Sequence, residues 1–579
     1  MTRNLFSILI LLLTACTTVM PPTPPNPTTL TTQQPNYLTT QPSMNNVDEL
    51  ISKMTLEQKA GQLLVIGFMG PKLTPELREM IEQHHVGSVI LFSLNQNIES
   101  PQQIAQLNHD LQTAAVNSGH VGLFICIDQE GGRVTRLFEN KGFTEFPSAM
   151  AIGATGKPGN AEHIARAIAV EMKALGLNVN FAPVLDVNNN AVNPIIGTRS
   201  FSSDPNIVAK FGVAFLKGLQ SEGILAFGKH FPGHGDTGTD SHIALPTVPH
   251  DRERLAAIEF VPFKAAMQND VAGIMTAHVT FPAIDPTEKL AATLSPKILS
   301  GLLRDEMKYN GLLVTDSLEM GAIGESGYPP PKAAATALKA GADLLLFNKG
   351  FDDHKKAIAL IIAQVKSGEI PRARLDQAVK RILIAKEKFG VITPAPINIS
   401  DAATRVGTAE IKSISRDVAA QSITLLRDDA KLLPLKPGTN VYVVESPALN
   451  NFGKLIGTSA VTVSASPTSA EITMVSGMAR TDTSRIFIVG LAGATANSSQ
   501  IRLVQELLNM KTKVVVVALR DPYDLMNVKS TTTMIATYSS TQPSLEALAN
   551  VLLGKAKPQG KLPVDLPDLY PLGYGISIP

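Results

Sequence analysis

The chain has 579 residues, of which 44% are hydrophobic and 17% are charged, and its formal net charge is +1. This composition is typical of a globular protein, and the length suggests roughly three to four domains, or fewer if one is a large barrel. The near-neutral charge excludes the electrostatic attraction on which nucleic-acid binding depends.

The first residues have the features of a targeting segment. Arg3 supplies a positive charge, and the apolar run from Leu5 to Leu13 is too short to span a bilayer. The run ends in Leu13-Thr14-Ala15-Cys16, which resembles the cleavage box of bacterial lipoproteins. The resemblance implies that residues 1–16 are a lipoprotein signal peptide and that Cys16 is acylated; a chance Cys in an ordinary signal peptide is the alternative.

Residues 17–45 are rich in Pro, Thr, Gln and Asn and cannot bury a core. We expect them to form a flexible tether between a lipid anchor and the folded part. Thr17 and Thr18 follow the Cys, with no Asp beside it. In a cell with two membranes we therefore expect a cell-envelope protein, anchored to the outer membrane and facing the periplasm.

Between residues 46 and 390, apolar runs of strand length alternate with segments of helical pattern. The apolar runs are 63–68, 86–92, 121–128, 178–187, 224–231, 272–279, 311–317 and 342–348, and the helical segments include 75–85, 161–176 and 252–268. Eight such units with nearly continuous apolar strands predict a closed parallel (β/α)8 barrel of the TIM type. An open doubly wound sheet is the alternative. Cys126, inside the third run, is expected to be a small buried hydrophobe.

Residues 391–405 contain a proline-rich break, which we interpret as a linker. A second pattern of alternating strands and helices fills residues 406–579. Its expected strands are 440–446, 485–493, 513–521 and 534–540, and its expected helix is 544–554. We predict a smaller layered α/β domain, an αβα sandwich, without a glycine-rich phosphate loop.

Polar residues recur where the predicted barrel strands end. They are Asp128, Asp186, Lys229, His230, His278, Asp316 and Asn348. In a (β/α)8 barrel the active site lies at the carboxyl ends of the strands. We expect Asp186 to be a structural turn or cap residue rather than a catalytic one.

The stretch KHFPGHGDTGTDSH, residues 229–242, combines one Lys, three His and two Asp. Its three Gly and one Pro exclude a regular helix. The preceding residues 224–228 have the pattern of a buried strand. We therefore expect the charged groups to leave a strand end and enter a mobile, glycine-rich loop, the kind of segment where chemistry concentrates. The alternative is a polar surface turn.

Several motifs resemble those of glycoside hydrolase family 3, in its β-N-acetylhexosaminidase branch. They are DQEGGRVTR (128–136), NFAPVLDVNNN (180–190), GTRSF (197–201), KHFPGHGDTGTDSH (229–242), MTAHVTFP (275–282), TDSLEM (315–320), RDPYDL (520–525) and GKLPVDLP (560–567). The resemblance covers nearly all of the chain after the tether. The long histidine loop separates this branch from the β-glucosidases of the family.

The resemblance implies a retaining exo-β-N-acetylglucosaminidase. Asp316 would be the nucleophile that forms a covalent glycosyl-enzyme intermediate. His242 would act as general acid and base in place of a carboxylic acid, and Asp240 would orient its ring. The alternative for Asp316 is a helix N-cap.

The other matching positions imply contacts to the sugar. Asp128, Arg136, Arg199, Lys229 and His230 match residues that bind substrate hydroxyls or the acetamide. We expect His278 to line the pocket and His234 to hold the shape of the loop. Together, His230, His234 and His242 could supply three metal ligands, but two of them have other roles and no HExxH motif exists, so we expect no metal and no cofactor.

The expected partners are an N-acetylglucosamine-containing glycan or muropeptide substrate and a membrane reached through the lipid anchor, with no nucleic acid, and we expect a monomer. A second hypothesis is a phosphorylase, because a neutral His would repel phosphate less than a carboxylate does. A third is a non-catalytic wall-binding lipoprotein, against which the joint presence of Asp316, Asp240 and His242 argues.

Overall fold

The structure is a computed structural model that describes residues 44–494 and 498–578. The predicted signal peptide, the lipidation site Cys16 and residues 17–43 of the predicted tether lie outside the described residues. In the part of the chain that is described, no helix combines the length and the apolar character needed to cross a membrane.

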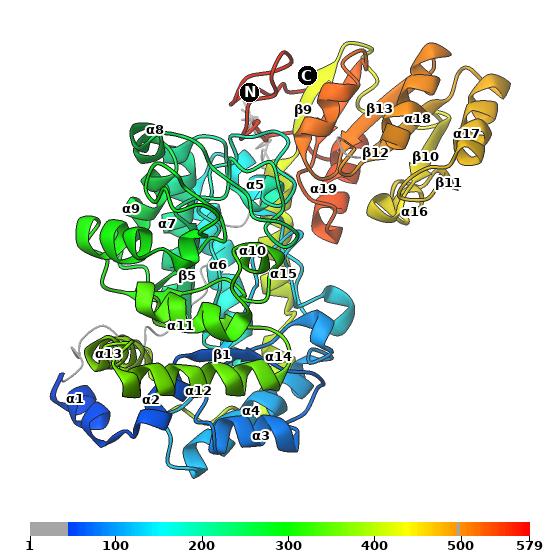
Figure 1. Cartoon of the computed structure of the whole chain (residues 1–579). Helices are drawn as coiled ribbons and strands as arrows, with labels where there is room; N and C mark the ends of the chain where they lie inside the picture. The colour runs from blue at the N-terminus through cyan, green and yellow to red at the C-terminus, as the bar shows by residue number, and fades with distance from the viewer. Residues whose placement is uncertain (1–43, 495–497, 579) are drawn as a thin grey trace, which may run out of the picture. The chain divides into compact units, whose positions relative to one another are not determined.

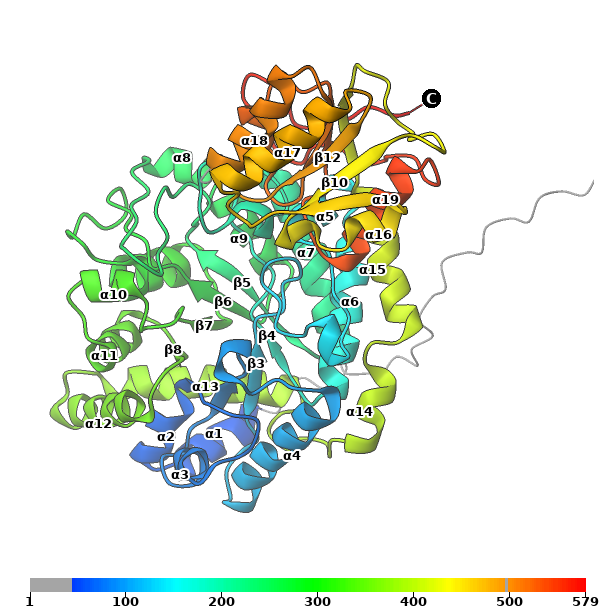
Figure 2. The same cartoon turned by 90° about the vertical axis from the view of Figure 1, so that its right-hand side faces the viewer.

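Eight parallel strands form the first sheet, each within a predicted apolar run, and Figure 2 labels β3 to β8 among them. They are β1 (Leu64–Gly67), β2 (Ser88–Ile90), β3 (Phe124–Ile127), β4 (Val179–Asn180), β5 (Leu225–Phe231), β6 (Gly273–Thr276), β7 (Leu312–Val314) and β8 (Leu345–Phe347). Their order is β7-β6-β5-β4-β3-β2-β1-β8, and a parallel bridge between Val314 and Leu344 brings the two ends together. The sheet is therefore a nearly closed barrel, which confirms the predicted (β/α)8 fold and excludes an open doubly wound sheet.

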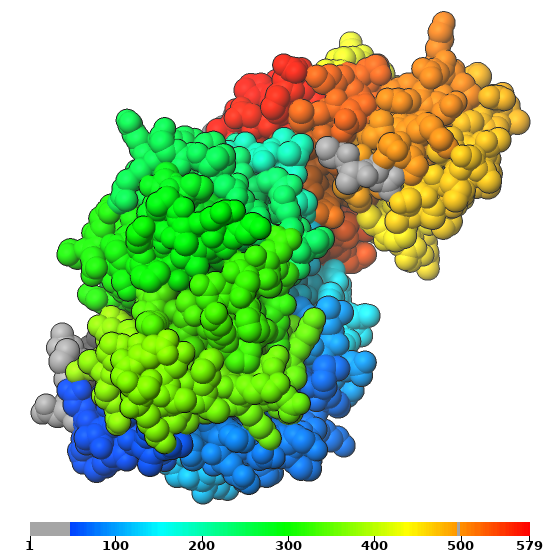
Figure 3. Space-filling model, viewed as in Figure 1, coloured from blue at the N-terminus to red at the C-terminus, as the bar shows by residue number. Residues whose placement is uncertain are grey.

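Two helices precede β1, and the others lie between or after the barrel strands in chain order. They are α1 (Met44–Lys53), α2 (Leu56–Gln62), α3 (Pro75–Glu82), α4 (Pro101–Asn117), α5 (Ala149–Ala154), α6 (Pro158–Ala174), α7 (Pro205–Ser221), α8 (Arg252–Ala257), α9 (Phe260–Gln268), the π-helix η5 (Lys297–Glu306), α10 (Gly321–Glu325), α11 (Pro330–Ala340), α12 (Phe351–Ser367) and α13 (Arg372–Lys388). Three of them begin with a capping side chain followed by proline: Thr74, Ser100 and Asp204 each accept an amide hydrogen bond ahead of α3, α4 and α7. The side chains of α12 and α13 form the continuous yellow-green surface in Figure 3.

The single helix expected over residues 252–268 is wrong, because the chain forms α8 and α9 instead. Pro262 causes the break: it has no amide hydrogen, and its ring would clash with the carbonyl group four residues earlier, at Ile258. Ile258 ends α8 with φ −125° and ψ −71°. Helix periodicity alone does not reveal such a break.

The predicted linker, 391–405, contains regular structure at its end. Residues 391–398 form neither helix nor strand, but α14 (Ile399–Arg405) follows and packs against α4 and α6. Helix α15 (Ala409–Ser422) then contacts α5 and α6 of the barrel and α19 of the second domain.

The second sheet has six strands in the order β11-β10-β12-β13-β14-β9, and Figure 1 labels β9 to β13 among them. They are β9 (Thr424–Asp428), β10 (Val441–Glu445), β11 (Ser459–Thr462), β12 (Ile486–Leu491), β13 (Lys513–Ala518) and β14 (Thr533–Ala536), with helices α16 (Phe452–Ile456), α17 (Ser469–Thr481), α18 (Ser498–Asn509) and α19 (Gln542–Leu552). All pairs are parallel except β9 with β14. Along β12, Phe487 and Val489 join one core with α17 and α18, whereas Ile486 and Ile488 join another with α16 and α19. The sheet is therefore covered on both faces, which confirms the αβα sandwich.

Sequence reasoning missed strands β9 and β11. Strand β11 lies at one edge of the sheet and is mostly exposed, so it lacks the apolar run that marks a buried strand. Strand β9 is the antiparallel strand at the other edge, and it begins two residues after α15.

Candidate active site

One end of the barrel collects the polar residues expected at the strand ends. Because parallel strands point the same way, residues that end them or follow them meet at the carboxyl end of the barrel. Lys229 and His230 lie within β5, which continues to Phe231. The strand therefore extends to the end of the predicted apolar run 224–231, so Lys229 and His230 belong to the strand and not to the loop that we expected them to enter, and both side chains have buried partners.

Four charged side chains form a buried network at this end. The ammonium group of Lys229 lies 2.8 Å from Oδ1 of Asp128 and 2.7 Å from Oε1 of Glu130. The guanidinium of Arg199 binds both oxygens of Glu130, with Nε to Oε2 at 2.9 Å and Nη2 to Oε1 at 2.8 Å. Two cations and two anions thus neutralise one another, as buried charges must.

The opposite charges of this network favour the ionised forms of Glu130 and Lys229. Burial would raise the pKa of Glu130, but Arg199 and Lys229 hold that pKa well below its usual range. Burial would likewise lower the pKa of Lys229, but Asp128 and Glu130 raise it. Glu130 and Lys229 therefore stay ionised at neutral pH, and the network presents fixed donors and acceptors to a neutral ligand.

Sequence reasoning missed Glu130, which joins Lys229 to Arg199. Glu130 follows β3 and precedes Gly131 and Gly132, which have φ angles of +92° and +58° and turn the chain back on itself. The side chain is almost fully buried. A Glu directly after a buried strand and before a glycine turn is the signal that could have found it.

Asp186 accepts three hydrogen bonds from the segment that begins the histidine loop. Its carboxylate binds Nδ1 of His230 at 2.7 Å, the amide of His230 at 3.2 Å and the amide of His234 at 2.7 Å. Nη2 of Arg199 lies 3.4 Å from Nε2 of His230 and can only donate. Asp186 therefore accepts a hydrogen bond from Nδ1–H of His230 and fixes the orientation of this ring.

Arg136 lies beside the network. Its Nη2 is 3.7 Å from Oδ2 of Asp128, and its guanidinium carbon lies 4.0 Å from the centre of the Phe92 ring. Among the described residues, its buried Nε has no hydrogen-bond partner. Arg136 thus has one donor without a partner, whereas Arg199 binds Glu130 through two of its nitrogens.

Asp316 follows β7 and is partly buried. Its Oδ1 accepts the amide of Ser317 at 2.7 Å, and the Ser317 carbonyl accepts Nε2–H of His278 at 2.8 Å. Burial would raise the pKa of Asp316, but the charges of His278, His230 and His242 and the Ser317 amide together lower it. The group at the predicted nucleophile position is therefore a carboxylate at neutral pH, and His278 holds the backbone next to it.

His242 and Asp240 form the predicted pair. Nδ1 of His242 lies 2.7 Å from Oδ1 of Asp240, which leaves Nε2 directed elsewhere. The His242 side chain is 57% exposed, so a ligand can reach it. Sequence proximity and geometry agree here, because a turn allows residues i and i+2 to meet.

The base of the histidine loop is held by many hydrogen bonds. The ring of His234 joins Thr237 Oγ1 and Ser241 Oγ, each at 2.8 Å. The side-chain amide of Asn193 donates to the carbonyls of His234 (2.9 Å) and Gly235 (2.8 Å). Burial lowers the pKa of His234 to about 4, so the ring is neutral and bridges the loop.

The end of the loop docks on α10, the helix that follows Asp316. The amides of Gly321 and Ala322 donate to the carbonyls of His242 (3.1 Å) and Ser241 (3.2 Å). The segment with the proton-donor candidate is therefore attached to the segment that follows the nucleophile candidate.

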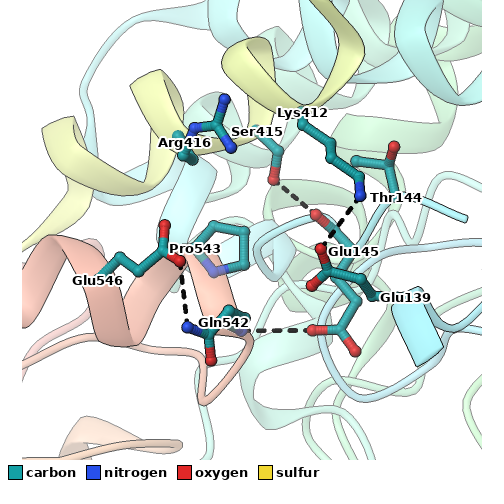
Figure 4. A pocket seen from close by; sticks show the side chains of 9 residues that line it. All are labelled: Glu139, Thr144, Glu145, Lys412, Ser415, Arg416, Gln542, Pro543 and Glu546. Carbon is teal, nitrogen blue, oxygen red and sulfur yellow. Dashed lines mark hydrogen bonds and ion pairs between the residues drawn. The ribbon is translucent and has the colours of Figure 1, made fainter. Parts of the chain in front are cut away.

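A pocket away from this cluster joins the barrel to the second domain (Figure 4). It is lined by Glu139, Thr144, Glu145, Lys412, Ser415, Arg416, Gln542, Pro543 and Glu546. The cavity volume of about 20 Å³ holds one or two waters and no sugar ring. Its contacts, such as the hydrogen bond from Ser415 Oγ to Glu145 O at 2.6 Å, belong to the structural interface between the barrel and the second domain.

The described residues contain no group of three or more His, Cys, Asp or Glu side chains arranged to hold a metal ion. Cys126 is buried in β3, and burial raises the pKa of its thiol well above the ordinary value. It is therefore a neutral thiol in the barrel core.

Two family models match the chain. Residues 55–385 match the glycosyl hydrolase family 3 N-terminal domain, and residues 423–570 match the glycosyl hydrolase family 3 C-terminal domain. The two matches correspond to the barrel and the sandwich.

Known proteins show the same likeness. Beta-hexosaminidase A of Pseudoalteromonas piscicida is 32% identical over 558 residues, which cover 85% of this chain and 91% of that protein. A beta-hexosaminidase of Pseudomonas aeruginosa is 36% identical over 315 residues, which cover 54% of this chain and 90% of that protein. The solved structure of a glycoside hydrolase family 3 beta-N-acetylglucosaminidase from Paenibacillus sp. FPU-7 is 39% identical, with a TM-score of 0.83, and the match covers 89% of this chain and 99% of that one. The chain therefore belongs to glycosyl hydrolase family 3 and is a glycoside hydrolase.

Proposed function

We propose that this protein is a retaining exo-β-N-acetylglucosaminidase that removes terminal β-linked N-acetylhexosamine. The observation that carries the proposal is the arrangement of Asp316 and the His242–Asp240 pair at one end of the barrel, with the histidine loop docked on α10. The beta-hexosaminidase and beta-N-acetylglucosaminidase relatives support the substrate class.

In the first step, the Asp316 carboxylate attacks the anomeric carbon and the bond from that carbon to the leaving oxygen breaks. Protonated His242 gives the proton on Nε2 to the leaving oxygen. The products of this step are a glycosyl ester of Asp316 and a neutral imidazole. Asp240 keeps the ring oriented through Nδ1–H.

In the second step, neutral His242 takes a proton from water through Nε2 while the water oxygen attacks the anomeric carbon. The ester bond to Asp316 breaks and the carboxylate returns. Two displacements at one carbon give net retention of configuration. Asp240 favours the imidazolium in both steps because it is an anion next to the ring.

The sugar-binding roles follow from the buried network. Asp128, which is partly accessible, accepts hydrogen bonds from sugar hydroxyls, and Arg136, whose side chain is also partly accessible, donates hydrogen bonds to them. Arg199, Lys229 and His230 are mutually fixed and therefore recognise the sugar without reorganising. His278 acts on the backbone after Asp316.

We further propose that the substrate comes from peptidoglycan fragments and that Cys16 carries the lipid anchor of an envelope protein. Both ideas rest on the amino-terminal sequence, with its short apolar run and its Leu13-Thr14-Ala15-Cys16 box. A muropeptide in the cell envelope is the N-acetylglucosaminide such a protein would meet.

Phosphorolysis is the second candidate. An exposed His as acid and base is neutral when the glycosyl ester reacts, so it does not repel phosphate as a carboxylate would. Rates with and without inorganic phosphate, and analysis for a sugar 1-phosphate, separate the two reactions. A non-catalytic wall-binding role predicts no turnover at all.

The deciding experiment compares the wild type with Asp316→Ala on a chromogenic N-acetylglucosaminide and on purified peptidoglycan fragments. The proposal requires a turnover number at most about a thousandth of the wild-type value, with an unchanged circular dichroism spectrum. Retention of a tenth or more of the activity would contradict the nucleophile role.

Azide then distinguishes the two catalytic roles. In Asp316→Ala, azide replaces the missing carboxylate and gives a glycosyl azide of inverted configuration. In His242→Ala, the glycosyl ester still forms, so azide attacks that ester and the product keeps the original configuration. The same anomer from both variants would contradict the assignment.

A further inference from the structure

The segment from residue 186 to residue 203 carries two groups of the site, Asp186 and Arg199. Four hydrogen-bonded residue pairs tie it to the second domain, whose active-site role the sequence leaves open. They are Asn188 with Tyr523, Thr198 with Asp521, and Ser202 and Ser203 with the carbonyl of Pro563. We call this set of contacts the domain latch.

Asp521 holds the turn directly before Arg199. Its Oδ1 accepts the amide of Thr198 at 3.1 Å, and its Oδ2 lies 2.9 Å from Nε of Arg520. Gly197 makes this approach possible, because a Cβ there would lie 2.3 Å from Oδ1 of Asp521. Gly197 also has φ +46°, in the left-handed region that favours glycine.

Tyr523 holds the other end of the segment. Its hydroxyl accepts Nδ2–H of Asn188 at 3.0 Å and lies 3.3 Å from the Asn188 carbonyl, to which it can donate. The backbone amide of Asn188 in turn donates to the carbonyl of Ser202 at 3.1 Å, so a hydrogen bond joins the two ends of the segment. Burial raises the pKa of Tyr523, so the phenol remains protonated and can fill both roles.

Arg199 is sensitive to this support because its guanidinium is bonded on two sides. It binds Glu130 through two hydrogen bonds and reaches His230 at 3.4 Å. A shift of the backbone at residue 198 would pull the guanidinium away from one partner or the other. Displacements of this kind near a binding site are costly even when no group is lost.

A shorter relative gives a useful comparison. The match to the beta-hexosaminidase of Pseudomonas aeruginosa covers 90% of that protein but only 54% of this chain. That protein is too short to hold both of the domains described above. The chemical groups of the barrel therefore need no second domain in principle, and the latch serves position rather than chemistry.

We propose that Asp521 and Tyr523 are positioning residues that act through Arg199: the second domain holds residues 186–203 so that Arg199 and His230 face the sugar. The proposal rests on the proposed function. It gives the sandwich domain a role in substrate binding even though none of its own side chains need touch the sugar.

The test uses Tyr523→Phe, Asp521→Ala and Asp521→Asn in the full chain, with Tyr538→Phe as the matched control. Tyr538 is also a buried phenol of the second domain with one hydrogen bond, to Thr424 Oγ1 at 2.8 Å, but that bond stays within the domain. We expect kcat/KM for a chromogenic N-acetylglucosaminide to fall about tenfold in Tyr523→Phe and Asp521→Ala, mainly through KM. Asp521→Asn still offers an oxygen to Thr198 and should stay within about twofold of the wild type.

Two kinetic outcomes would overturn the latch. One is an equal fall in kcat/KM in Tyr523→Phe and Tyr538→Phe, which would indicate general destabilisation. The other is an equal loss in Asp521→Asn and Asp521→Ala, which would remove the hydrogen bond to Thr198 as the cause.

A double-mutant cycle then tests whether Asp521 acts through Arg199. When Arg199→Ala is already present, Asp521→Ala should cost less than about twofold more. Full additivity of the two losses would contradict the coupling.

Hydrogen exchange measures the effect of the domain latch independently of enzyme activity. Amides between residues 196 and 203 should exchange faster in Tyr523→Phe than in the wild type and in Tyr538→Phe. If the wild type proves inactive, the proposed function fails, while the exchange measurement still decides the latch. Unchanged exchange in Tyr523→Phe would overturn it.

Discussion

Oδ1 of Asp240 lies 2.7 Å from Nδ1 of His242 and 2.9 Å from the backbone nitrogen of the same residue. One carboxylate oxygen therefore fixes both the ring and the main chain of His242. Burial would raise the pKa of Asp240, but the hydrogen bonds and charge of His242 lower it. Asp240 is thus ionised at neutral pH, and the proton on Nδ1 stays in place while Nε2 is free to exchange its own.

His242→Ala should harm natural substrates far more than aryl glycosides with good leaving groups. The expected loss on a disaccharide is about 100- to 10,000-fold, because a sugar oxygen must be protonated as it leaves, whereas a nitrophenolate need not be. Steady-state kinetics on both substrates measure the difference. His250→Ala is the control, since His250 follows the loop and pairs with Asp236 at 2.5 Å. Equal losses on both substrates would show that His242 only positions the substrate or the loop.

Glu130→Gln should lower both stability and substrate affinity. The substitution keeps the shape but leaves Arg199 and Lys229 with one anion fewer in a buried site, which we expect to cost about 3 kcal/mol in the free energy of unfolding. Urea denaturation and kcat/KM measure the two effects. The control is Glu139→Gln, which breaks a pair with Lys412 in which both side chains are about one third exposed and which should cost less than about 1 kcal/mol. Similar small costs for both variants would contradict the importance of the network.

His234 should make the fold sensitive to mild acid. Its pKa is about 4 in the folded protein against an ordinary value of 6.5, because the ring is buried. Above pH 6.5 the ring is neutral in both states and has no effect. As the pH falls from 6.5 towards 4, the unfolded chain binds a proton that the folded chain rejects, so stability is lost.

The expected loss from His234 between pH 7 and pH 5 is about 2 kcal/mol. Denaturant titrations at both pH values, on the wild type and on His234→Gln, measure it. The variant should be less stable at pH 7 but should lose less on acidification. An identical acid response in both proteins would show that His234 is not the group responsible.

Cys16→Ser should release the protein from membranes or leave its precursor uncleaved. The reason is that lipid chains on Cys16 would be its anchor, and two or more chains are needed for stable attachment. Fractionation and amino-terminal mass spectrometry of the mature protein give the answer. Cys126→Ser is the control, because that thiol is buried in β3. Finding the wild type entirely in the cytoplasm would contradict both the localisation and the choice of envelope material as substrate.

The barrel could be predicted from the sequence because its strands are buried on both faces and appear as apolar runs, such as Leu345–Phe347. The edge strand Ser459–Thr462 could not, because it is exposed and lacks that signal. The site residues likewise differ in how much of their role the local sequence could predict. Asp316 and Lys229 were visible as polar residues within or just after apolar strands. Glu130 also follows an apolar strand, but its link between Lys229 and Arg199 could not be predicted because these two partners lie far along the chain.

Asp186 shows a second limit of sequence reasoning. Its structural role was expected, but the three hydrogen-bond donors it binds, on His230 and His234, depend on how the strands β4 and β5 are paired. The same holds for Asp521 and Tyr523, whose motif was recognised while their contacts with the barrel were not.

The docking of the histidine loop on α10 has a consequence for protein engineering. A side chain at position 321 would place its Cβ 2.5 Å from the carbonyl oxygen of Ile243. Only glycine therefore fits at this position, where the loop contacts the turn. Grafting residues 229–242 alone onto another barrel would leave His242 without the contact to α10 that holds this end of the loop. The exchangeable unit is therefore the loop together with the glycine turn beneath it, two pieces that a recombination breakpoint between β5 and β7 would separate.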